Sequence, residues 1–468
     1  MTELERALQA IPAVDRILAS PPFAALGRRW RREGLRRYVQ LRLASYREEL
    51  RAGGEALDRR AFMARLPRAW AADWRALVGH GTRRVLNATG VALHTNLGRA
   101  PLAPAARRAV ERAGRGAVDL ELDLDSGKRA SRVRKVEVLL RALTGAEAAF
   151  AVNNNAAALT LAVDTLAHKR RLIVSRGEQV EIGGSFRLPE ILSRFAGKMV
   201  EVGTTNRTRL SDYAKAIARR GDVLLKVHRS NFRLEGYVAE ADLAALAALG
   251  RERGCPLIYD LGSGRFDPEP GWLAEPQLAA VLAAGPDLVT FSADKVFGGP
   301  QAGIVLGRAD LLAALRANPM ARALRLGKLS LAALIETLAL RLRTDAALPV
   351  QALMARSRKA LRAQARDLAA RLADAGPPAL KVAVVDSEAR SGGGAAAEAD
   401  WPSAALRLRL PGRSAGRLAA RLREADPAVL GVVRREELLL DMAALTPEEI
   451  PVLARVLARV LNKEAASA

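Results

Sequence analysis

The stretch that decides the fold runs from residue 291 to residue 303 and reads FSADKVFGGPQAG. Short apolar segments flank it at 287–290 and 303–307, and both are predicted to be buried strands. The stretch holds one lysine, Lys295, in a chain that uses few lysines. The pKa of an amine at the end of buried strands can fall far enough for the amine to act as a nucleophile. The alternative is an ordinary loop lysine that stays in solvent. We therefore interpret Lys295 as a functional residue, and the glycines after it as room for a planar ligand.

An acid lies at the end of the preceding predicted strand. Asp260 closes the apolar segment 256–260 and is followed by a Gly-Ser-Gly turn. Three roles are open for its carboxylate: it can cap the turn, bind a metal, or pair with the protonated nitrogen of an aromatic ring. Partner acids for a metal site do not cluster nearby in the sequence. The third role is the one that fits together with Lys295.

A predicted anion site lies earlier in the chain. A strand at 149–152 is followed by the segment 153–158, which opens a helix expected to run to about residue 166. Backbone N–H groups and the helix dipole attract anions at such an end. Neither a Gly-x-x-x-x-Gly-Lys-Ser/Thr nor a Gly-x-Gly-x-x-Gly motif occurs here, so a monophosphate is favoured over a nucleotide. We assign its contacts to Asn154, Asn155 and Ala156, although many helices simply start with asparagine.

The central region alternates between predicted strands and helices. The strands are expected at 171–175, 199–202, 223–227 and 256–260. This alternation indicates a mainly parallel sheet that binds ligands at the carboxyl ends of its strands. A phosphate site, an acid and a lysine in this order are what pyridoxal 5′-phosphate requires, because lysine forms the Schiff base and the acid keeps the pyridinium protonated. We predict this cofactor in an aspartate aminotransferase-like α/β fold of type I, with further contacts from Asn231 and Ser292.

The chain is predicted to form three domains. They are a helical N-terminal domain at 1–80, the cofactor-binding large domain at 81–340 and a small α/β C-terminal domain at 341–468. Pro21-Pro22 is expected to break the chain in the first domain, and a long helical stretch is expected at 329–375. The small domain shows no evident site, and its glycine run 391–395 reads as a flexible insert.

Three arginines are candidates for an anion pocket. Arg99 follows Gly98 and lies two residues before Pro101, in an irregular segment, 85–102, that we expect to cross the site. Arg322 and Arg325 are three residues apart and share a face if their segment is helical, so together they could clamp an oxyanion. For Arg99 the alternative is an ordinary surface arginine, and for the pair it is a solvated basic helix.

The formal net charge is +24, from 74 basic and 50 acidic residues. Such an excess favours a polyanionic partner, and nucleic acid first. Residues 28–38 concentrate six arginines and two aromatic residues, which could pair with phosphates and stack on bases. An amphipathic helix with a solvated basic face is the alternative. Because arginine supplies nearly all the positive charge and alanine is abundant, drift in a GC-rich genome also accounts for the composition.

Composition also bounds the compartment and the metal chemistry. Cys255 is the only cysteine, so an intrachain disulfide and a cysteine-based metal site are excluded. The four histidines show no ligand spacing, and no metal is expected. No charge-free apolar run of about 18 residues occurs, and the N-terminus lacks the apolar core of a signal peptide. We expect a cytoplasmic protein with no membrane partner.

Longer motifs make the chain recognisable. They are NATG at 87–90, HTNLGRAPL at 94–102, EVGTTNRT at 201–208, DLGSG at 260–264 and the lysine stretch with GGPQAG. Together they closely resemble the bacterial selenocysteine synthases, the L-seryl-tRNA(Sec) selenium transferase family, and the resemblance covers nearly the whole chain. Ala293 stands where glycine is expected, and residues 391–399 look like an insert specific to this lineage.

The resemblance implies an enzyme that uses pyridoxal 5′-phosphate and selenophosphate to convert L-seryl-tRNA(Sec) to L-selenocysteinyl-tRNA(Sec), by way of an aminoacrylyl intermediate. It implies that Lys295 is the Schiff-base lysine and that Asp260 faces the ring nitrogen. The anion pocket for selenophosphate would be lined by Arg99, Arg322 and Arg325. The family's N-terminal domain binds the tRNA, and its members form a ring of dimers, commonly a homodecamer, with sites at the dimer interfaces.

Two other functions compete with this one. A pyridoxal-phosphate lyase or ammonia-lyase for a free amino acid or a phosphorylated amino sugar would keep the same site without needing tRNA, and the basic N-terminal domain argues against it. A non-catalytic RNA-binding protein on a decayed enzyme scaffold would bind tRNA but would not hold the cofactor on a lysine. Gel shift of tRNA(Sec) and covalent cofactor attachment separate the three.

Overall fold

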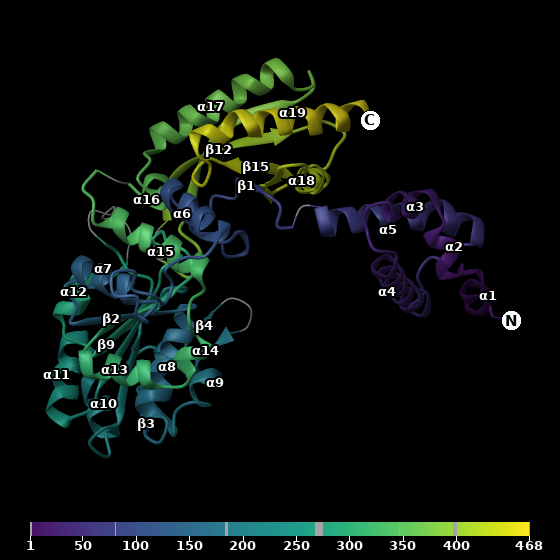
Figure 1. Ribbon diagram of the computed structural model, residues 1–468. Helices are drawn as coiled ribbons and strands as arrows, with labels where there is room; N and C mark the ends of the chain where they lie inside the picture. Colours follow the sequence, from purple (N-terminus) through teal and green to yellow (C-terminus); the bar gives the residue numbers. More distant parts are fainter. Residues whose placement is uncertain are drawn as a thin grey trace. The chain divides into compact units, whose positions relative to one another are not determined.

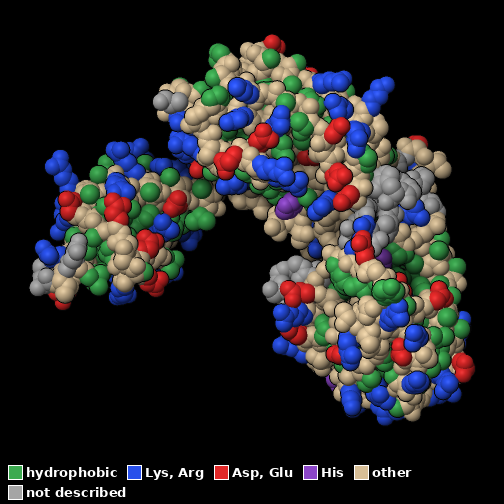
Figure 2. All heavy atoms as spheres, turned by 180° about the vertical axis from the view of Figure 1, so that it is seen from behind, with side chains coloured by type: hydrophobic (Ala, Val, Ile, Leu, Met, Phe, Trp, Pro, Cys, Tyr) green, Lys and Arg blue, Asp and Glu red, His purple; other side chains and the backbone are tan. Residues whose placement is uncertain are grey.

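The computed structural model describes residues 2–79, 81–182, 186–266, 275–345, 347–395 and 400–467. The chain divides into two compact units, Met1–Arg84 and Val85–Ala468. No helix within the described residues is both long and apolar enough to cross a membrane. Basic side chains are scattered over the surface of both units, with acidic side chains among them (Figure 2).

The first unit is a group of helices around a core of aromatic and aliphatic side chains (Figure 1). Its helices are α1 Glu3–Ala10, α2 Val14–Leu18, α3 Pro21–Gly27, α4 Arg32–Arg51 and α5 Arg59–Gly79. The break expected at Pro21-Pro22 is present, because α2 ends at Leu18 and these prolines begin α3. Proline suits the first helical position, where its missing N–H would have had no intrahelical partner.

The aromatic residues of the basic stretch 28–38 turn toward the core. Tyr38 is buried, and its hydroxyl donates a hydrogen bond to the Trp70 carbonyl at 3.1 Å. The half-buried ring of Trp30 packs edge-on against Trp74, with 5.8 Å between centroids. The expectation that both aromatics offer stacking faces to bases is therefore wrong for Tyr38. Most of the arginines of the stretch are exposed, and only those from Arg32 onward lie on a helix, α4.

The second unit is built on a seven-stranded sheet in the order β2-β10-β9-β8-β7-β3-β6 (Figure 1). The strands are β2 Ala148–Val152, β3 Arg171–Ser175, β6 Lys198–Val202, β7 Val223–Val227, β8 Leu257–Gly262, β9 Leu288–Ser292 and β10 Gly303–Gly307. β10 is antiparallel to both of its neighbours, and every pair from β9 to β6 is parallel. β7, β8 and β9 are buried along their whole length, as expected for a sheet covered on both faces.

Helices and short elements surround this sheet. They are η1 Thr95–Leu97, α6 Pro104–Arg115, α7 Arg134–Thr144, α8 Asn155–Ala167, η2 Arg176–Glu178, β4 Glu181–Ile182, β5 Phe186–Arg187, α9 Leu188–Leu192, α10 Leu210–Ala216, α11 Leu243–Arg253, α12 Leu278–Ala283, α13 Ala309–Ala317, α14 Met320–Ala323 and α15 Lys328–Arg341. The helical stretch predicted at 329–375 is divided into α15, α16 Pro349–Met354 and α17 Arg358–Ala375. Pro349 starts a new helix because it cannot continue an existing one, and Ser357 caps α17.

A second, antiparallel sheet has the order β11-β12-β15-β14. Its strands are β11 Lys381–Arg390, β12 Asp400–Arg409, β14 Val432–Arg434 and β15 Glu437–Asp441. α17, α18 Ala415–Glu424 and α19 Ile450–Ala466, which follows η3 Pro447–Glu449, share one apolar core with it. β1 Val85–Asn87 pairs in parallel with β13 Ala428–Leu430, so Leu86 lies in this core although the sequence placed it in the large domain. The division at residue 340 stays a prediction.

Candidate active site

The carboxyl ends of β8 and β9 bring the predicted acid and the predicted lysine together. Asp260 lies in β8, opposite Thr290 of β9, and Lys295 follows the end of β9. Both side chains are buried. The parallel register is the reason, because strands that run in the same direction end at the same edge of the sheet.

Asp260 is held by three hydrogen bonds. Asn155 Nδ2 donates to Oδ1 at 2.8 Å, Thr290 Oγ1 donates to it at 2.9 Å, and the Gly262 N–H donates to it at 3.2 Å. Burial raises the pKa of this carboxyl, and these bonds act against the rise. All three bonds reach Oδ1, so Oδ2 is the oxygen that can accept a hydrogen bond from a ligand.

The start of α8 forms the predicted phosphate cradle. Asn154 is the N-cap, and its side chain accepts a hydrogen bond from the Ala157 N–H at 2.9 Å. The N–H groups of Asn155 and Ala156 come first in the helix, where no carbonyl one turn earlier can accept from them. β10 packs directly against this end: a Cβ on Gly303 would lie 2.1 Å from the Asn154 carbonyl oxygen. The last glycine of the lysine stretch therefore permits the close approach of strand and cradle.

Lys295 lies among charged groups but has a backbone carbonyl as its hydrogen-bond acceptor. Its amine donates to Gly394 O at 2.6 Å. Burial lowers the pKa of this amine and the charge of Arg99 lowers it further, while Glu275, Asp260 and Asp294 act in the opposite direction. A lowered pKa leaves more of the amine uncharged and nucleophilic at neutral pH.

Arg99 and Ser292 both bind the acid that precedes Lys295. Arg99 Nη1 lies 3.1 and 2.9 Å from the two carboxylate oxygens of Asp294, and Ser292 Oγ donates to Oδ1 at 2.6 Å. Arg99 has a positive φ of 60°, an unusual conformation for a residue other than glycine. Together with Gln301 and neighbouring residues, Arg99 and Asp294 line a cavity of about 520 Å³.

The other predicted site residues lie at different distances from this centre. Asn231 donates to the Glu181 carbonyl at 2.6 Å and approaches Gly394. The Leu324 carbonyl accepts from the Asn153 N–H at 2.9 Å, which places the segment around α14 beside the cradle. Two predicted residues of that segment, Arg322 and Arg325, are exposed and contact neither Arg99 nor Lys295 among the described residues. α14 ends at Ala323, so the two arginines do not share a helix.

Sequence reasoning missed several residues of this centre. Thr290 and Asp294 could have been found, because both lie on or next to the strand that leads to Lys295. The contact of Gly394 with Lys295 could not, because it joins segments that are far apart in the chain. The C-terminal region, in which the sequence showed no evident site, therefore contributes a contact to this centre.

The glycines at 298 and 299 have a packing role that the sequence did not predict. A Cβ on Gly298 would lie 2.7 Å from Val350 Cγ1, and one on Gly299 would lie 3.2 Å from the Ala293 carbonyl oxygen. These glycines make room for α16 and for their own loop. Gly299 also lines the cavity that contains Arg99 and Asp294, so the interpretation of the pair as space for a planar ligand stays a prediction.

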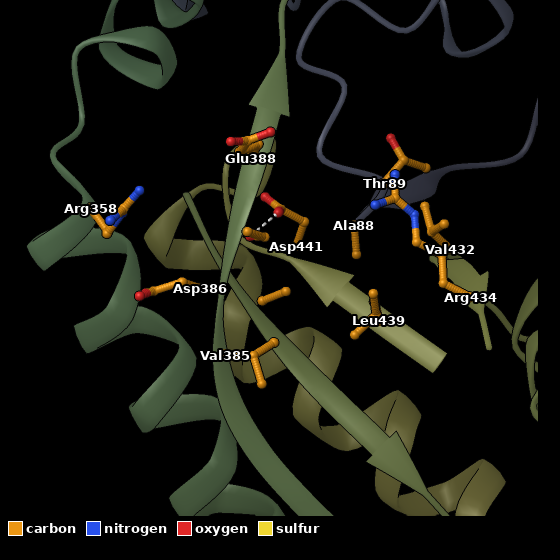
Figure 3. Close-up of a pocket in the computed structure, with 12 residues that line it drawn as sticks. Ala88, Thr89, Arg358, Val385, Asp386, Glu388, Val432, Arg434, Leu439 and Asp441 are labelled. Atoms are coloured by element: carbon orange, nitrogen blue, oxygen red, sulfur yellow. Dashed lines mark hydrogen bonds between the residues drawn. The ribbon is translucent and has the colours of Figure 1, made fainter. Parts of the chain in front are cut away.

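A separate cavity of about 400 Å³ lies on the C-terminal sheet (Figure 3). Arg358 and Arg434 stand on opposite sides of it, with Asp441 between them. Asp441 accepts hydrogen bonds from Ser387 at 2.6 Å and Ser403 at 2.8 Å. None of the predicted site residues lines this cavity, so it is distinct from the centre around Lys295.

The residues around Lys295 fit pyridoxal 5′-phosphate. Asn155 Oδ1 and Ser263 Oγ, beside Asp260, are buried and have no hydrogen-bond partner among the described residues. Buried polar atoms rarely stay unpaired, so these two indicate a missing polar ligand. The helix end, the carboxylate and the amine match the phosphate, ring nitrogen and aldehyde of this cofactor. In the described parts of the chain, no cluster of three or more His, Cys, Asp or Glu could hold a metal ion.

Comparison with known proteins places the chain among close relatives. The model of a family described as L-seryl-tRNA selenium transferase matches residues 85–446. A protein named L-seryl-tRNA(Sec) selenium transferase from Solidesulfovibrio magneticus is 42% identical over 478 residues, covering 99% of this chain and 100% of that protein. One of the same name from Aquifex aeolicus is 40% identical over 421 residues, covering 89% and 92%.

A solved structure of D-glucosaminate-6-phosphate ammonia-lyase matches with a TM-score of 0.56 and 21% identity, covering 84% of this chain and 99% of that chain. At this identity the likeness bears on the fold alone. Together with the sheet topology, it confirms the predicted fold, an α/β architecture of type I with a mainly parallel central sheet. The family match and the two relatives are much closer, and by them the chain belongs to the L-seryl-tRNA selenium transferase family.

Proposed function

We propose that this chain converts L-seryl-tRNA(Sec) to L-selenocysteinyl-tRNA(Sec), with pyridoxal 5′-phosphate as cofactor and selenophosphate as selenium donor. It is a transferase of selenocysteine biosynthesis, as its family and its relatives are named. The observation that supports the cofactor best is the arrangement of Lys295, Asp260 and the start of α8 at one edge of the sheet. This arrangement supplies one protein group for each reactive or charged part of the cofactor.

Each residue has a task in the proposed reaction. The N–H groups of Asn155 and Ala156 would hold the phosphate, and Asp260 Oδ2 would accept a hydrogen bond from the protonated ring nitrogen and so keep it protonated. When bound, pyridoxal 5′-phosphate supplies an electron sink for the charge that forms at the seryl Cα. Lys295 is the attachment point, and its Nζ, once released, is placed to take the proton from Cα. The lowered pKa of the Lys295 amine keeps it ready to accept that proton at neutral pH.

Arg99 is the proposed contact for selenophosphate. Its Nη1 is bound to Asp294, and a guanidinium group has further N–H donors for an oxyanion in the adjoining cavity. Asp294 and Lys295 are adjacent in the sequence, so the ion pair between Asp294 and Arg99 also keeps Arg99 close to Lys295. We keep Arg322 and Arg325 as proposed contacts of the same anion. They are exposed in the single chain, which is compatible with a pocket completed by a second chain.

The wider assembly is also proposed. The unit Met1–Arg84 would bind tRNA, because its arginines are mostly exposed and Arg28, Arg29 and Arg31 have no ion-pair partner among the described residues. The chain would act in the cytoplasm as a homo-oligomer, a ring of dimers with ten copies. A single arginine-rich surface of this kind reads phosphate charge and shape, not base sequence.

Anaerobic turnover tests the proposal. Purified protein loaded with pyridoxal 5′-phosphate is incubated with seryl-tRNA(Sec) and selenophosphate, and selenium on the tRNA is measured. Selenocysteinyl-tRNA is expected from the complete mixture and not when selenophosphate is omitted. A parallel reaction with free serine tests the lyase alternative, in which pyruvate and ammonia form without tRNA. Turnover of free serine with none of seryl-tRNA(Sec) would overturn the proposal.

A further inference from the structure

The glycine run 391–395 follows the end of β11 and reaches the lysine. Gly394 O accepts the hydrogen bond from the Lys295 amine at 2.6 Å. A Cβ on Gly394 would lie 3.5 Å from the same amine and 3.7 Å from Asn231 Cβ. This segment of the C-terminal region therefore borders the site on the side of Asn231.

The segment is anchored and not loose. The Ser391 carbonyl accepts from the Leu93 N–H at 2.6 Å, and the Ala395 N–H donates to Gly392 O at 3.1 Å. Ser391 and Ala395 are each 1% exposed, and Ala395 shares an apolar cluster with Leu93 and Val296. The expectation of a flexible insert is wrong for these five residues. Residues 396–399 of the predicted insert lie outside the described part of the chain.

Three consecutive glycines are required here by both conformation and space. Gly392, Gly393 and Gly394 have φ values of 72°, 69° and 67°, in the left-handed region that other residues avoid. A Cβ on Gly392 would lie 2.2 Å from Val91 Cγ1, and one on Gly393 would lie 2.6 Å from the Leu93 carbonyl oxygen. Only glycine lets the backbone pass this close to residues 91–93 and still direct a carbonyl at Lys295.

We propose that Ser391–Ala395 is a wall of the active site and that the Gly394 carbonyl is a positioning group for the Lys295 amine before the cofactor is attached. The inference rests on the proposed function only in taking Lys295 as the residue that binds the cofactor. It assigns an active-site role to a backbone carbonyl from the C-terminal region, 99 residues from the lysine in sequence.

This contact has a consequence for cofactor uptake. A carbonyl accepts a hydrogen bond from either form of the amine but stabilises the charged form more. Only the uncharged amine condenses with the aldehyde: its nitrogen bonds to the aldehyde carbon, a C=N bond forms, and the aldehyde oxygen leaves as water. The Gly394 carbonyl therefore holds the amine in place and raises the pH at which it reacts.

The test compares two glycines with the same conformational strain. Gly394→Val forces a β-branched residue into a left-handed position beside Lys295. Gly412→Val does the same at φ 75° in the loop before α18, where a Cβ would have no atom within 4 Å. Cofactor-free protein is mixed with pyridoxal 5′-phosphate across a pH series, and covalent attachment is followed by its visible absorbance, without tRNA or selenophosphate. Gly394→Ala is the milder variant if Gly394→Val does not fold.

Displacing the Gly394 carbonyl is expected to move the pH midpoint of cofactor attachment down by about one unit, the size of one hydrogen bond to a charged group. Gly412→Val should keep the midpoint of the unaltered chain. An unchanged or higher midpoint in both Gly394 variants would overturn the inference. If the unaltered chain attached no cofactor at any pH, the proposed function would fail instead, so the two failures can be told apart.

Discussion

Two lysines, one in a strand of the central sheet and one just after a strand, are equally buried but have different neighbours. Lys226 in β7 and Lys295 after β9 are each 6% exposed. Lys226 lies 3.0 Å from a carboxylate oxygen of Glu178 and 3.0 Å from one of Glu240. Lys295 donates to a backbone carbonyl, and its closest charged neighbours include the cation Arg99.

The pKa values of the two amines shift in opposite directions. Burial lowers the pKa of Lys226, but the charges of Glu178 and Glu240 outweigh burial, so its pKa is raised. At Lys295 burial and Arg99 act together, and its pKa is lowered. Burial by itself therefore does not activate a lysine. The partners decide whether a buried amine is a structural cation or a nucleophile.

The largest expected effect follows from removing the reactive amine. Lys295→Ala should abolish covalent attachment of pyridoxal 5′-phosphate and reduce turnover below detection, because no other described amine has this environment. Visible absorbance and anaerobic turnover measure the two losses. Lys226→Met is the matched control and should still attach the cofactor. Cofactor attachment that survives Lys295→Ala and disappears in Lys226→Met would reverse the assignment of the two lysines.

The free energy of unfolding, in contrast to cofactor attachment, should depend strongly on Lys226. Lys226→Met leaves the buried carboxylate of Glu178 without its cation, and breaking a buried pair in this way costs about 3–5 kcal/mol of unfolding free energy. Denaturant unfolding measures this loss. The double variant with Glu178→Gln should recover part of it, since both charges are then absent. A double variant as unstable as the single one would show that the pair itself is not responsible.

His228 lies just beyond β7, and the charges of both Lys226 and Lys295 act on its imidazole. Burial, ahead of the surrounding charges, lowers its pKa from 6.5 to about 4. The unfolded chain takes up this proton near pH 6.5 and the folded chain only near pH 4, so the stability contribution falls as the pH decreases between these values, by up to about 3 kcal/mol. His228→Gln should remove that part of the pH dependence of unfolding. If the unfolding free energy of the variant depended on pH equally steeply, other titratable groups would be responsible for that dependence.

The smallest effect concerns the first unit. There, too, some arginines have an ion-pair partner and others have none among the described residues. Arg32 and Arg36 pair with Asp15, and Arg37 pairs with Glu33. Replacing Arg28, Arg29 and Arg31 by glutamine should make tRNA affinity less dependent on salt. In a plot of the logarithm of affinity against the logarithm of salt concentration, the slope should become less steep by up to about 0.7–0.9 per lost phosphate contact. The same change at Arg32, Arg36 and Arg37 should change the slope less, because Asp15 and Glu33 already offset part of the charge of these three cations. Equal slopes in the two triple variants would contradict this distinction.

Much of the fold could be predicted from local patterns. Continuous apolar runs predicted the central strands, including β10 from its first residue to its last, and the helix predicted to open within residues 153–158 is confirmed as α8, which begins at Asn155. A rule based on local pattern failed where a proline interrupts an otherwise helical stretch. Pro349 divides a stretch that was predicted to be continuous.

By itself the sequence determined the chemistry: a lysine in an apolar setting, an acid at the end of a strand, a helix start rich in small polar residues, and motifs of one enzyme family. These are properties of short segments, set by residue type and spacing. Only the tertiary structure decided which groups surround that lysine and hold it. Asp294 joins Arg99 to the lysine loop, and the Gly394 carbonyl comes from a segment after β11 that is distant in the sequence. Such contacts depend on strand order and close backbone packing, which no local pattern records.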